Sequence, residues 1–157
     1  MDTQQQLNQA SPAEIHTIRH GFEVGSYHLL IAPQTRAEVV KSPAVCPLPG
    51  TPDWFIGVMN HRGEAVPVYD LDKYLEIIEE PVQAKRWVLL IDTQPNTVGV
   101  ILQTPPLSVI DPDRLSEPVG DLPEVFKTAV NDLYQRDGVQ WLEMDHQQLF
   151  LALKKQF

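Results

Sequence analysis

The fold is decided by the segment Trp54–Leu71, which reads WFIGVMNHRGEAVPVYDL. It contains two short apolar runs, Phe55–Asn60 and Ala65–Tyr69, in which β-branched and aromatic side chains are frequent. Only residues 61–64 separate these runs, and Gly63 can supply the positive φ that a tight turn needs. The segment therefore predicts a β-hairpin.

Proline spacing excludes a helical bundle. The chain has 14 prolines in 157 residues, which is about 9% and nearly twice the average share. Between Pro33 and Pro123 no proline-free stretch exceeds 14 residues, so long helices fit only outside that region. Pro67 lies inside the second run of the hairpin and lacks a backbone donor. Its strand is therefore predicted to be an edge strand or a bulged one.

Similar short runs recur along the rest of the chain, which is typical of an all-β protein. Residues 22–24 and 27–31 alternate between apolar and polar side chains on either side of Gly25. The runs Trp87–Ile91 and Val98–Leu102 are continuously apolar and are separated by a proline-containing turn. They predict a second hairpin that is more deeply buried than the first.

Two short helices are predicted from their capping residues. Asp70 or Asp72 can begin a helix that runs through Ile78. Asp145, three residues before Gln148, can begin a helix at the C-terminal end.

Residues 122–133 fit two structures. Their apolar side chains have helical spacing, with Asp121 placed to cap the helix and Pro123 in its first turn. Residues 129–134, however, also lead through a turn into the run Val139–Met144, as in a hairpin. The local pattern leaves both open.

A weak repeat relates the two halves of the chain. Gly63 precedes Asp70 by seven residues, and Gly138 precedes Asp145 by the same interval. Each pair encloses an apolar strand, and each aspartate is placed to begin a short helix. The two occurrences are 75 residues apart, so the repeat predicts two similar β-units.

The charge and the cysteine count exclude several kinds of partner and location. The chain has 12 Lys and Arg against 21 Asp and Glu, for a net charge of −9. A nucleic-acid partner needs clustered cations, which this sequence lacks. No apolar run reaches the length of about 18–20 residues that a membrane-spanning helix requires. The single cysteine, Cys46, and the polar first residues favour a reducing, cytoplasmic compartment.

The sequence carries no recognisable catalytic motif. It has no glycine-rich phosphate loop and no pair of cysteines, and its histidines lack the spacing of zinc ligands. We therefore expect no catalytic residue, no metal and no cofactor. Arg62 is either a surface arginine or, with its planar donors, a partner for a carboxylate. The rival interpretation is a small β-barrel enzyme or ligand-binding protein that uses His61, Arg62, Glu64 and Asp70 around a cleft.

The hairpin resembles the CheW family, the scaffold domain of bacterial chemosensory arrays. The residues that carry the resemblance are Leu48-Pro49, Pro52, Phe55-Ile56, Gly57-Val58, Asn60, Arg62-Gly63, Val66-Pro67 and Asp70-Leu71. The family implies an all-β fold of two intertwined, five-stranded SH3-like barrels with short helices. It implies a CheW-like domain over residues 21–157, with two subdomains that divide near residues 80–85. The residues before this domain are polar and Gln-rich with nothing to bury, which predicts a mobile tail over residues 1–20. The family also implies a strand near residues 129–134.

The resemblance implies a function without chemistry. Family members bind the regulatory domain of a CheA-type histidine kinase and the cytoplasmic tip of a methyl-accepting chemoreceptor. The chain is therefore expected to be a non-catalytic adaptor in the cytoplasm, associated with membrane-anchored receptor arrays. It is expected to be a monomer in isolation, with no membrane insertion.

The family also implies which residues bind partners, namely Glu38, Val39, Gly57, Asn60, Arg62, Gly63, Trp87 and Gly99. Glu38 is expected to pair with Arg62 near the receptor groove. Gly57 and Gly63 are expected to let the turn and a partner approach closely. Val39 and Trp87 are expected at the groove itself, and Gly99 beside it.

One departure from the family stands out. Pro105 and Pro106 occur where a groove strand is expected, and they would remove two donors from it. The departure predicts a divergent adaptor, such as one serving a pilus-driven twitching pathway. It leaves open a CheW-like regulatory module that binds the kinase but not the receptors.

Overall fold

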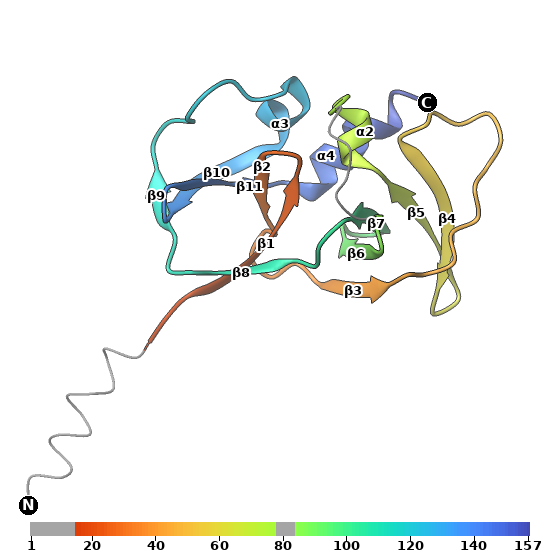
Figure 1. Cartoon of the computed structure of the whole chain (residues 1–157), viewed down its shortest axis with the longest axis horizontal. Coiled ribbons are helices and arrows are strands. Elements are labelled where there is room, and N and C mark those ends of the chain that lie inside the picture. The colour runs from red at the N-terminus through yellow and green to blue at the C-terminus, as the bar shows by residue number, and fades with distance from the viewer. Residues whose placement is uncertain (1–14, 78–83) are drawn as a thin grey trace, which may run out of the picture.

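The computed structural model describes residues 15–77 and 84–157 (Figure 1). These residues form two β-sheets and three short helices, which confirms the all-β prediction. The helices are α2 (Leu71–Tyr74), α3 (Glu124–Ala129) and α4 (His146–Lys154). They lie together along one side of the molecule, and β8 and β3 lie along the opposite side (Figure 1).

Sheet A has six strands in the order β8-β1-β2-β11-β10-β9. Its strands are β1 (Ile18–Val24), β2 (Tyr27–Leu30), β8 (Leu107–Ile110), β9 (Asp113–Leu115), β10 (Val130–Arg136) and β11 (Val139–Met144). The short β9 gives this sheet one strand more than the predicted five.

Sheet B has five strands in the order β3-β6-β7-β5-β4. Its strands are β3 (Ala37–Lys41), β4 (Phe55–His61), β5 (Glu64–Tyr69), β6 (Trp87–Asp92) and β7 (Thr97–Leu102). Both predicted hairpins, β4–β5 and β6–β7, belong to this sheet.

The two sheets are intertwined. The hairpin β1–β2 pairs with the late strands β8 and β11, and the hairpin β6–β7 pairs with the early strands β3 and β5. A division of the chain near residues 80–85 therefore separates the sequence repeats but not the sheets. Each sheet takes strands from both sides of that point.

The weak repeat is real in three dimensions. The turns Arg62-Gly63 and Asp137-Gly138 both have two consecutive positive φ angles. Each turn leads into a strand that ends at a capping aspartate and that pairs in parallel with a strand of a distant hairpin, β5 with β7 and β11 with β2. The two sheets are thus built on one plan.

Apolar burial occurs in three places. The largest cluster joins side chains of both sheets with those of α3 and α4, including Phe22, Tyr69, Phe126 and Phe150. A smaller cluster around Met59 and Val66 belongs to sheet B, and another around Leu30 and Trp141 belongs to sheet A. This distribution agrees with two small barrels packed over a common core.

The helices differ in part from the prediction. Asp70 caps α2 by accepting the Lys73 N–H at 3.2 Å, but the helix ends at Tyr74. Glu76 has a φ of 56°, which an α-helix does not allow. The predicted helical end at Ile78 lies outside the described residues. Asp145 begins α4 as predicted, by accepting the Gln148 N–H at 3.1 Å.

Both predicted structures occur within residues 122–133, one after the other. Residues 124–129 form α3, and β10 starts at Val130. The expected cap at Asp121 is not used, because Pro123 occupies the N-cap position without a side-chain bond. The helical spacing correctly predicted the helix in the first half of the segment, and the hairpin pattern correctly predicted the strand in the second half.

The prediction that β5 is an edge strand is wrong, because β5 lies between β4 and β7. The alternative of a bulge is met nearby, since the register of the β4–β5 ladder shifts between Phe55 and Gly57, opposite Tyr69 and Val68. Pro67 is tolerated there because it faces Val58, whose N–H and C=O both bond to Cys46. The parallel pairing with β7 begins only at Val68. Neither neighbour therefore requires a donor from Pro67.

The predicted tail is also too long at its C-terminal end. Residues 18–20 belong to β1, where they pair with β8. The first 14 residues of that predicted tail lie outside the described part of the chain.

Candidate functional site

Glu38 and Arg62 meet on the outer surface of sheet B. The Arg62 Nη2 atom donates to Glu38 Oε1 at 2.8 Å, and His61 Nε2 lies 2.9 Å from Glu38 Oε2. The Arg62 side chain is 76% exposed and that of Glu38 is 47% exposed. The structure thus brings together the two residues expected to pair, and it adds His61.

The hairpin turn positions Arg62. Arg62 and Gly63 have φ values of 51° and 83°, the geometry of a two-residue turn that follows the twist of its strands. Asn60 stabilises the turn by accepting the Gly63 N–H on Oδ1 at 3.0 Å. Asn60 and Gly63 therefore shape the turn that presents the guanidinium.

The pair contributes little to folding. Exposed ion pairs stabilise proteins by about 0–1 kcal/mol, because water screens both charges. The structural effect of the pair is to hold the tip of the β4–β5 hairpin against β3. The guanidinium that remains exposed can meet a carboxylate or a carbonyl of a partner.

An open groove lies beside this pair, between β1 of sheet A and β3 of sheet B. It has a volume of about 580 Å³ and is lined by residues 17–20, 31–35 and 37–39 together with Leu89 and Pro106. Glu38 borders both this groove and the depression that contains Arg62. Val39 lies in the groove.

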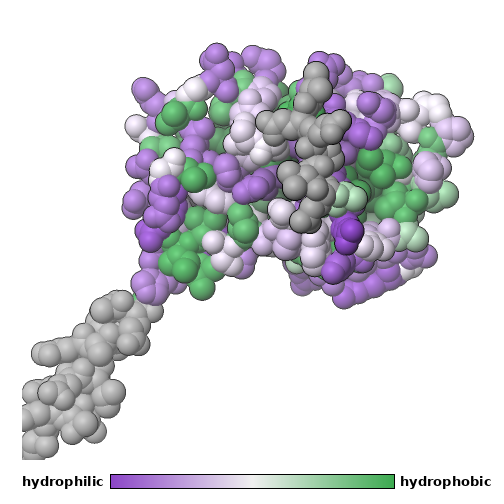
Figure 2. All heavy atoms as spheres, viewed as in Figure 1, coloured by the Kyte–Doolittle hydropathy of each residue, from purple (hydrophilic) through white to green (hydrophobic). Residues whose placement is uncertain are grey.

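The groove continues into an apolar surface. Ile18 of β1 and Ile110 of β8 are directly opposite each other in the ladder, and each is more than two fifths exposed. Figure 2 shows hydrophobic side chains gathered in this region, near the N-terminal end of the described chain. One face of the molecule thus joins an apolar surface, a groove and an exposed ion pair.

Trp87, Gly57 and Gly99 do not line the groove. The Trp87 ring lies 5.2 Å from the Lys41 ammonium, and it is half-buried against the core that the two sheets share. A Cβ on Gly99 would come within 2.9 Å of Val88 and 3.3 Å of Val68, inside sheet B. Trp87 lies on the same face of β6 as Leu89, which does line the groove, so the partner roles of Trp87 and Gly99 stay predictions.

Gly57 is required by the chain itself. Its φ is 145°, and a Cβ there would collide with the backbone of Cys46. Cys46 pairs with Val58 at this edge of sheet B. The close approach expected of a partner at Gly57 is made by the protein's own residues 46–47.

Pro105 and Pro106 do not lie on a strand. β7 ends at Leu102 and β8 begins at Leu107, so the two prolines belong to the connection between the sheets. Pro106 lines the groove. The departure thus changes the wall of the groove and removes no bond from a sheet ladder.

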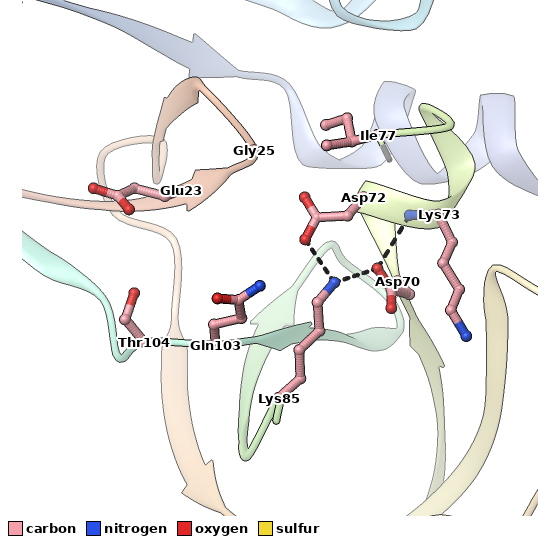
Figure 3. Close-up of a pocket in the computed structure, with 9 residues that line it drawn as sticks. All are labelled: Glu23, Gly25, Asp70, Asp72, Lys73, Ile77, Lys85, Gln103 and Thr104. Carbon is pink, nitrogen blue, oxygen red and sulfur yellow. Dashed lines mark hydrogen bonds and ion pairs between the residues drawn. The ribbon is translucent and has the colours of Figure 1, made fainter. Parts of the chain in front are cut away.

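The residues of the rival enzyme interpretation do not form one cleft. His61, Arg62 and Glu64 line the open depression at the hairpin tip. Asp70 lies in a different pocket, where it accepts bonds from the Lys73 N–H and from Lys85 Nζ (Figure 3). Lys85 also lies 2.6 Å from Asp72. Asp70 therefore has a structural role as a helix cap and an ion-pair partner.

No metal site occurs in the described part of the chain. Residues 15–77 and 84–157 contain no group of three His, Cys, Asp or Glu side chains arranged to hold an ion. Within these same ranges, no helix has the length and apolar character to cross a membrane.

Sequence reasoning missed the part of the groove wall formed by Arg19 and residues 31–35. These segments are distant along the chain from β3 and meet it only in the folded protein. One signal was available, because Glu143 is a charged residue within the apolar run Val139–Met144. A charge in such a position needs a buried partner.

Two intertwined β-sheets with an open groove between them define a double-barrel fold. The comparisons agree with this class. A family model described as CheW-like domain matches residues 21–153. The chain belongs to the CheW-like family, the scaffold proteins of chemosensory pathways.

Two curated relatives are similar in sequence. Protein FrzA of Myxococcus xanthus is 32% identical over 83 residues, which are 53% of this chain and 52% of FrzA. The matched part of this chain thus spans about half the length of FrzA. Protein PilI of Pseudomonas aeruginosa is 27% identical over 124 residues, which are 78% of this chain and 68% of PilI.

A solved structure supports the fold. The crystal structure of the scaffolding protein TtCheW from Thermoanaerobacter tengcongensis superposes with a TM-score of 0.67 at 19% identity. The superposition covers 87% of this chain and 93% of that protein. It confirms the SH3-like double-barrel architecture.

Proposed function

We propose that this protein is a non-catalytic adaptor that couples methyl-accepting chemoreceptors to a CheA-type histidine kinase. It would bind the regulatory domain of the kinase and the cytoplasmic tip of the receptor, in the cytoplasm at receptor arrays. The observation that carries the proposal is the groove between the two sheets, bordered by the exposed Glu38–Arg62 pair, in a chain of the CheW-like family.

The groove suits a helical partner. Exposed Val39 and Ile18 lie on opposite sides of it, and Leu89 is at its floor. An amphipathic helix can place its apolar face in such a groove and its polar residues at the rim. Glu38 and Arg62 would supply the polar rim contacts on the sheet B side.

The other expected partner residues divide by position. Asn60, Gly63 and Gly57 act by shaping the hairpin and its edge, as their contacts indicate. Gly99 acts through the packing of sheet B. Trp87 is half-buried beside Lys41 of the neighbouring strand β3, and its exposed part is available to a second partner, for which the kinase domain is the candidate.

We also propose that the pathway drives pilus-based twitching. Similarity to PilI and FrzA supports this choice. The alternative is a CheW-like module that binds the kinase alone. Pro106 in the wall of the groove favours this alternative, because it departs from the family pattern at the proposed receptor site.

Isothermal titration calorimetry tests the proposal. The purified chain is titrated separately with the kinase regulatory domain and with a soluble, dimeric receptor tip from the same organism. The adaptor proposal expects binding to both. Binding to the kinase domain alone would establish the regulatory alternative, and binding to neither at high micromolar concentration would reject both.

A further inference from the structure

The repeat allows equivalent positions in the two sheets to be compared. Val68 and Glu143 each stand two residues before a capping aspartate, so they are equivalent. Val68 pairs with Gly99 of β7, and Glu143 pairs with Leu30 of β2. In the antiparallel hairpins, Gly99 faces Leu90 of β6, and Leu30 faces Gly21 of β1. Val88 stands two residues before Leu90, and Arg19 stands two residues before Gly21, so Val88 and Arg19 are equivalent as well.

Sheet A therefore has an ion pair where sheet B has two valines. Val68 and Val88 are buried in the small apolar cluster of sheet B. At the equivalent positions Arg19 Nη2 donates to Glu143 Oε2 at 2.9 Å, and the two side chains are only 12% and 8% exposed. A buried ion pair is seldom more stabilising than apolar residues of similar volume. Its presence calls for a reason other than stability.

That reason is visible at one peptide group, Ile31–Ala32. Arg19 Nη2 also donates to the Ile31 carbonyl at 3.2 Å, and the Ala32 N–H donates to His146 Nε2 at 3.2 Å. Side chains from β1 and α4 thus hold both ends of the same peptide group. Glu143 holds the arginine in place.

The peptide group needs these partners because the chain leaves sheet A there. In sheet B the equivalent residues of β7, Val100 and Ile101, continue the strand and pair with β6. In sheet A, β2 ends at Leu30 and the chain crosses to β3. Buried backbone groups that leave a ladder must find other partners.

The peptide group is also the start of a groove wall. Residues 31–35 line the groove on the path from β2 to β3, and Arg19 lines it from β1. We propose that Arg19, Glu143 and His146 form a clamp on the Ile31–Ala32 peptide that positions this wall for partner recognition. The clamp consists of positioning residues, and its effect on binding rests on the function proposed above.

The other sheet supplies the substitution that tests the clamp. The double variant Arg19→Val/Glu143→Val installs the pair that sheet B uses and leaves no buried charge unpaired. The control is Arg114→Val/Asp132→Val, which removes an exposed ion pair of the same sheet from a site on β9 and β10. Arg19→Lys is a second variant, which keeps a charge beside Glu143 but replaces the planar guanidinium, whose Nη2 reaches both acceptors, with a tetrahedral ammonium on a shorter side chain.

Amide hydrogen exchange measures how firmly the clamp holds the groove wall, and it needs no partner. The double variant should exchange the amides of residues 31, 32, 34 and 35 at least tenfold faster than the wild type, with those of β6 and β7 unchanged. Arg19→Lys should show a smaller increase at the same residues. The control should match the wild type. Unchanged exchange at residues 31, 32, 34 and 35 in the double variant would overturn the clamp, and an increase spread over both sheets would mean a purely structural pair.

Calorimetry with the soluble receptor tip measures the effect of the clamp on binding affinity. The double variant should bind roughly tenfold more weakly than the wild type, whereas the control should bind equally. Wild-type affinity in a double variant with faster exchange would overturn the positioning role. If the wild type does not bind the tip, the receptor function fails, and the exchange result alone still decides whether the clamp holds the wall.

Discussion

His146 makes a quantitative prediction about acid stability. The side chain is buried at the start of α4, and only 4% of the residue is exposed. Its Nε2 atom accepts the Ala32 N–H, so this nitrogen carries no proton, and its Nδ1 atom has no partner in the described structure. Burial lowers the pKa of His146 from 6.5 to about 4, although the charge of Asp145 opposes the change.

The direction of the effect follows from the difference in pKa between the folded and unfolded chains. Above pH 6.5 the imidazole is neutral in both, and the contribution of His146 to stability is complete. As the pH falls below 6.5, His146 binds a proton in the unfolded chain but stays neutral in the folded chain, so the free energy of unfolding declines. The decline stops near pH 4. An interval of roughly 2.5 pH units at 1.36 kcal/mol each gives a loss of about 3 kcal/mol.

Urea unfolding from pH 7.5 to pH 4 measures this loss, with the variant His146→Phe as reference. The variant should be less stable at neutral pH by about 1–3 kcal/mol, because the buried Ala32 N–H loses its acceptor. The stability of the variant should not show the decline with falling pH that His146 causes. The difference in free energy of unfolding between the two proteins should therefore close or reverse toward pH 4. His20→Gln removes an exposed histidine and should keep the wild-type slope. Parallel stability curves for the wild type and His146→Phe would refute the reasoning.

Three further changes test other parts of the molecule. Arg62→Ala should change the free energy of unfolding by less than about 1 kcal/mol but weaken receptor binding, and Arg114→Ala is the matched control. A large fall in melting temperature with normal binding would show that Arg62 has a structural role instead. Gly57→Ala should destabilise by about 1–3 kcal/mol or more, measured by thermal unfolding, because its positive φ and the Cys46 backbone leave no room for a Cβ; wild-type stability would contradict this. Asp145→Ala should cost about 1 kcal/mol by the loss of the α4 cap, and an unchanged urea midpoint would argue against the cap.

The sequence alone determined the features that depend on neighbouring residues. The β4–β5 hairpin follows from a turn whose geometry Arg62 and Gly63 can adopt without help from the rest of the chain. The start of α4 follows from Asp145, whose side chain bonds an amide three residues away. Proline spacing excluded long helices by the same local steric rules.

The resemblance added one long-range contact, the pairing of Glu38 with Arg62, that no local rule provides. Whether the residues implied by the family contact partners stays a prediction. The structure nonetheless separates Val39, which lines the groove, from Gly99, which packs inside sheet B.

The pairing of distant segments follows from the three-dimensional fold alone. Periodicity indicates which side chains are buried but not which strand lies beside which, so Pro67 suggested an edge strand although β5 is internal. The exchange of hairpins between the two repeats is likewise hidden, because each hairpin has the same local pattern whichever sheet it joins. The same is true of the Arg19–Glu143 pair, whose members are 124 residues apart and meet only because β11 pairs with β2.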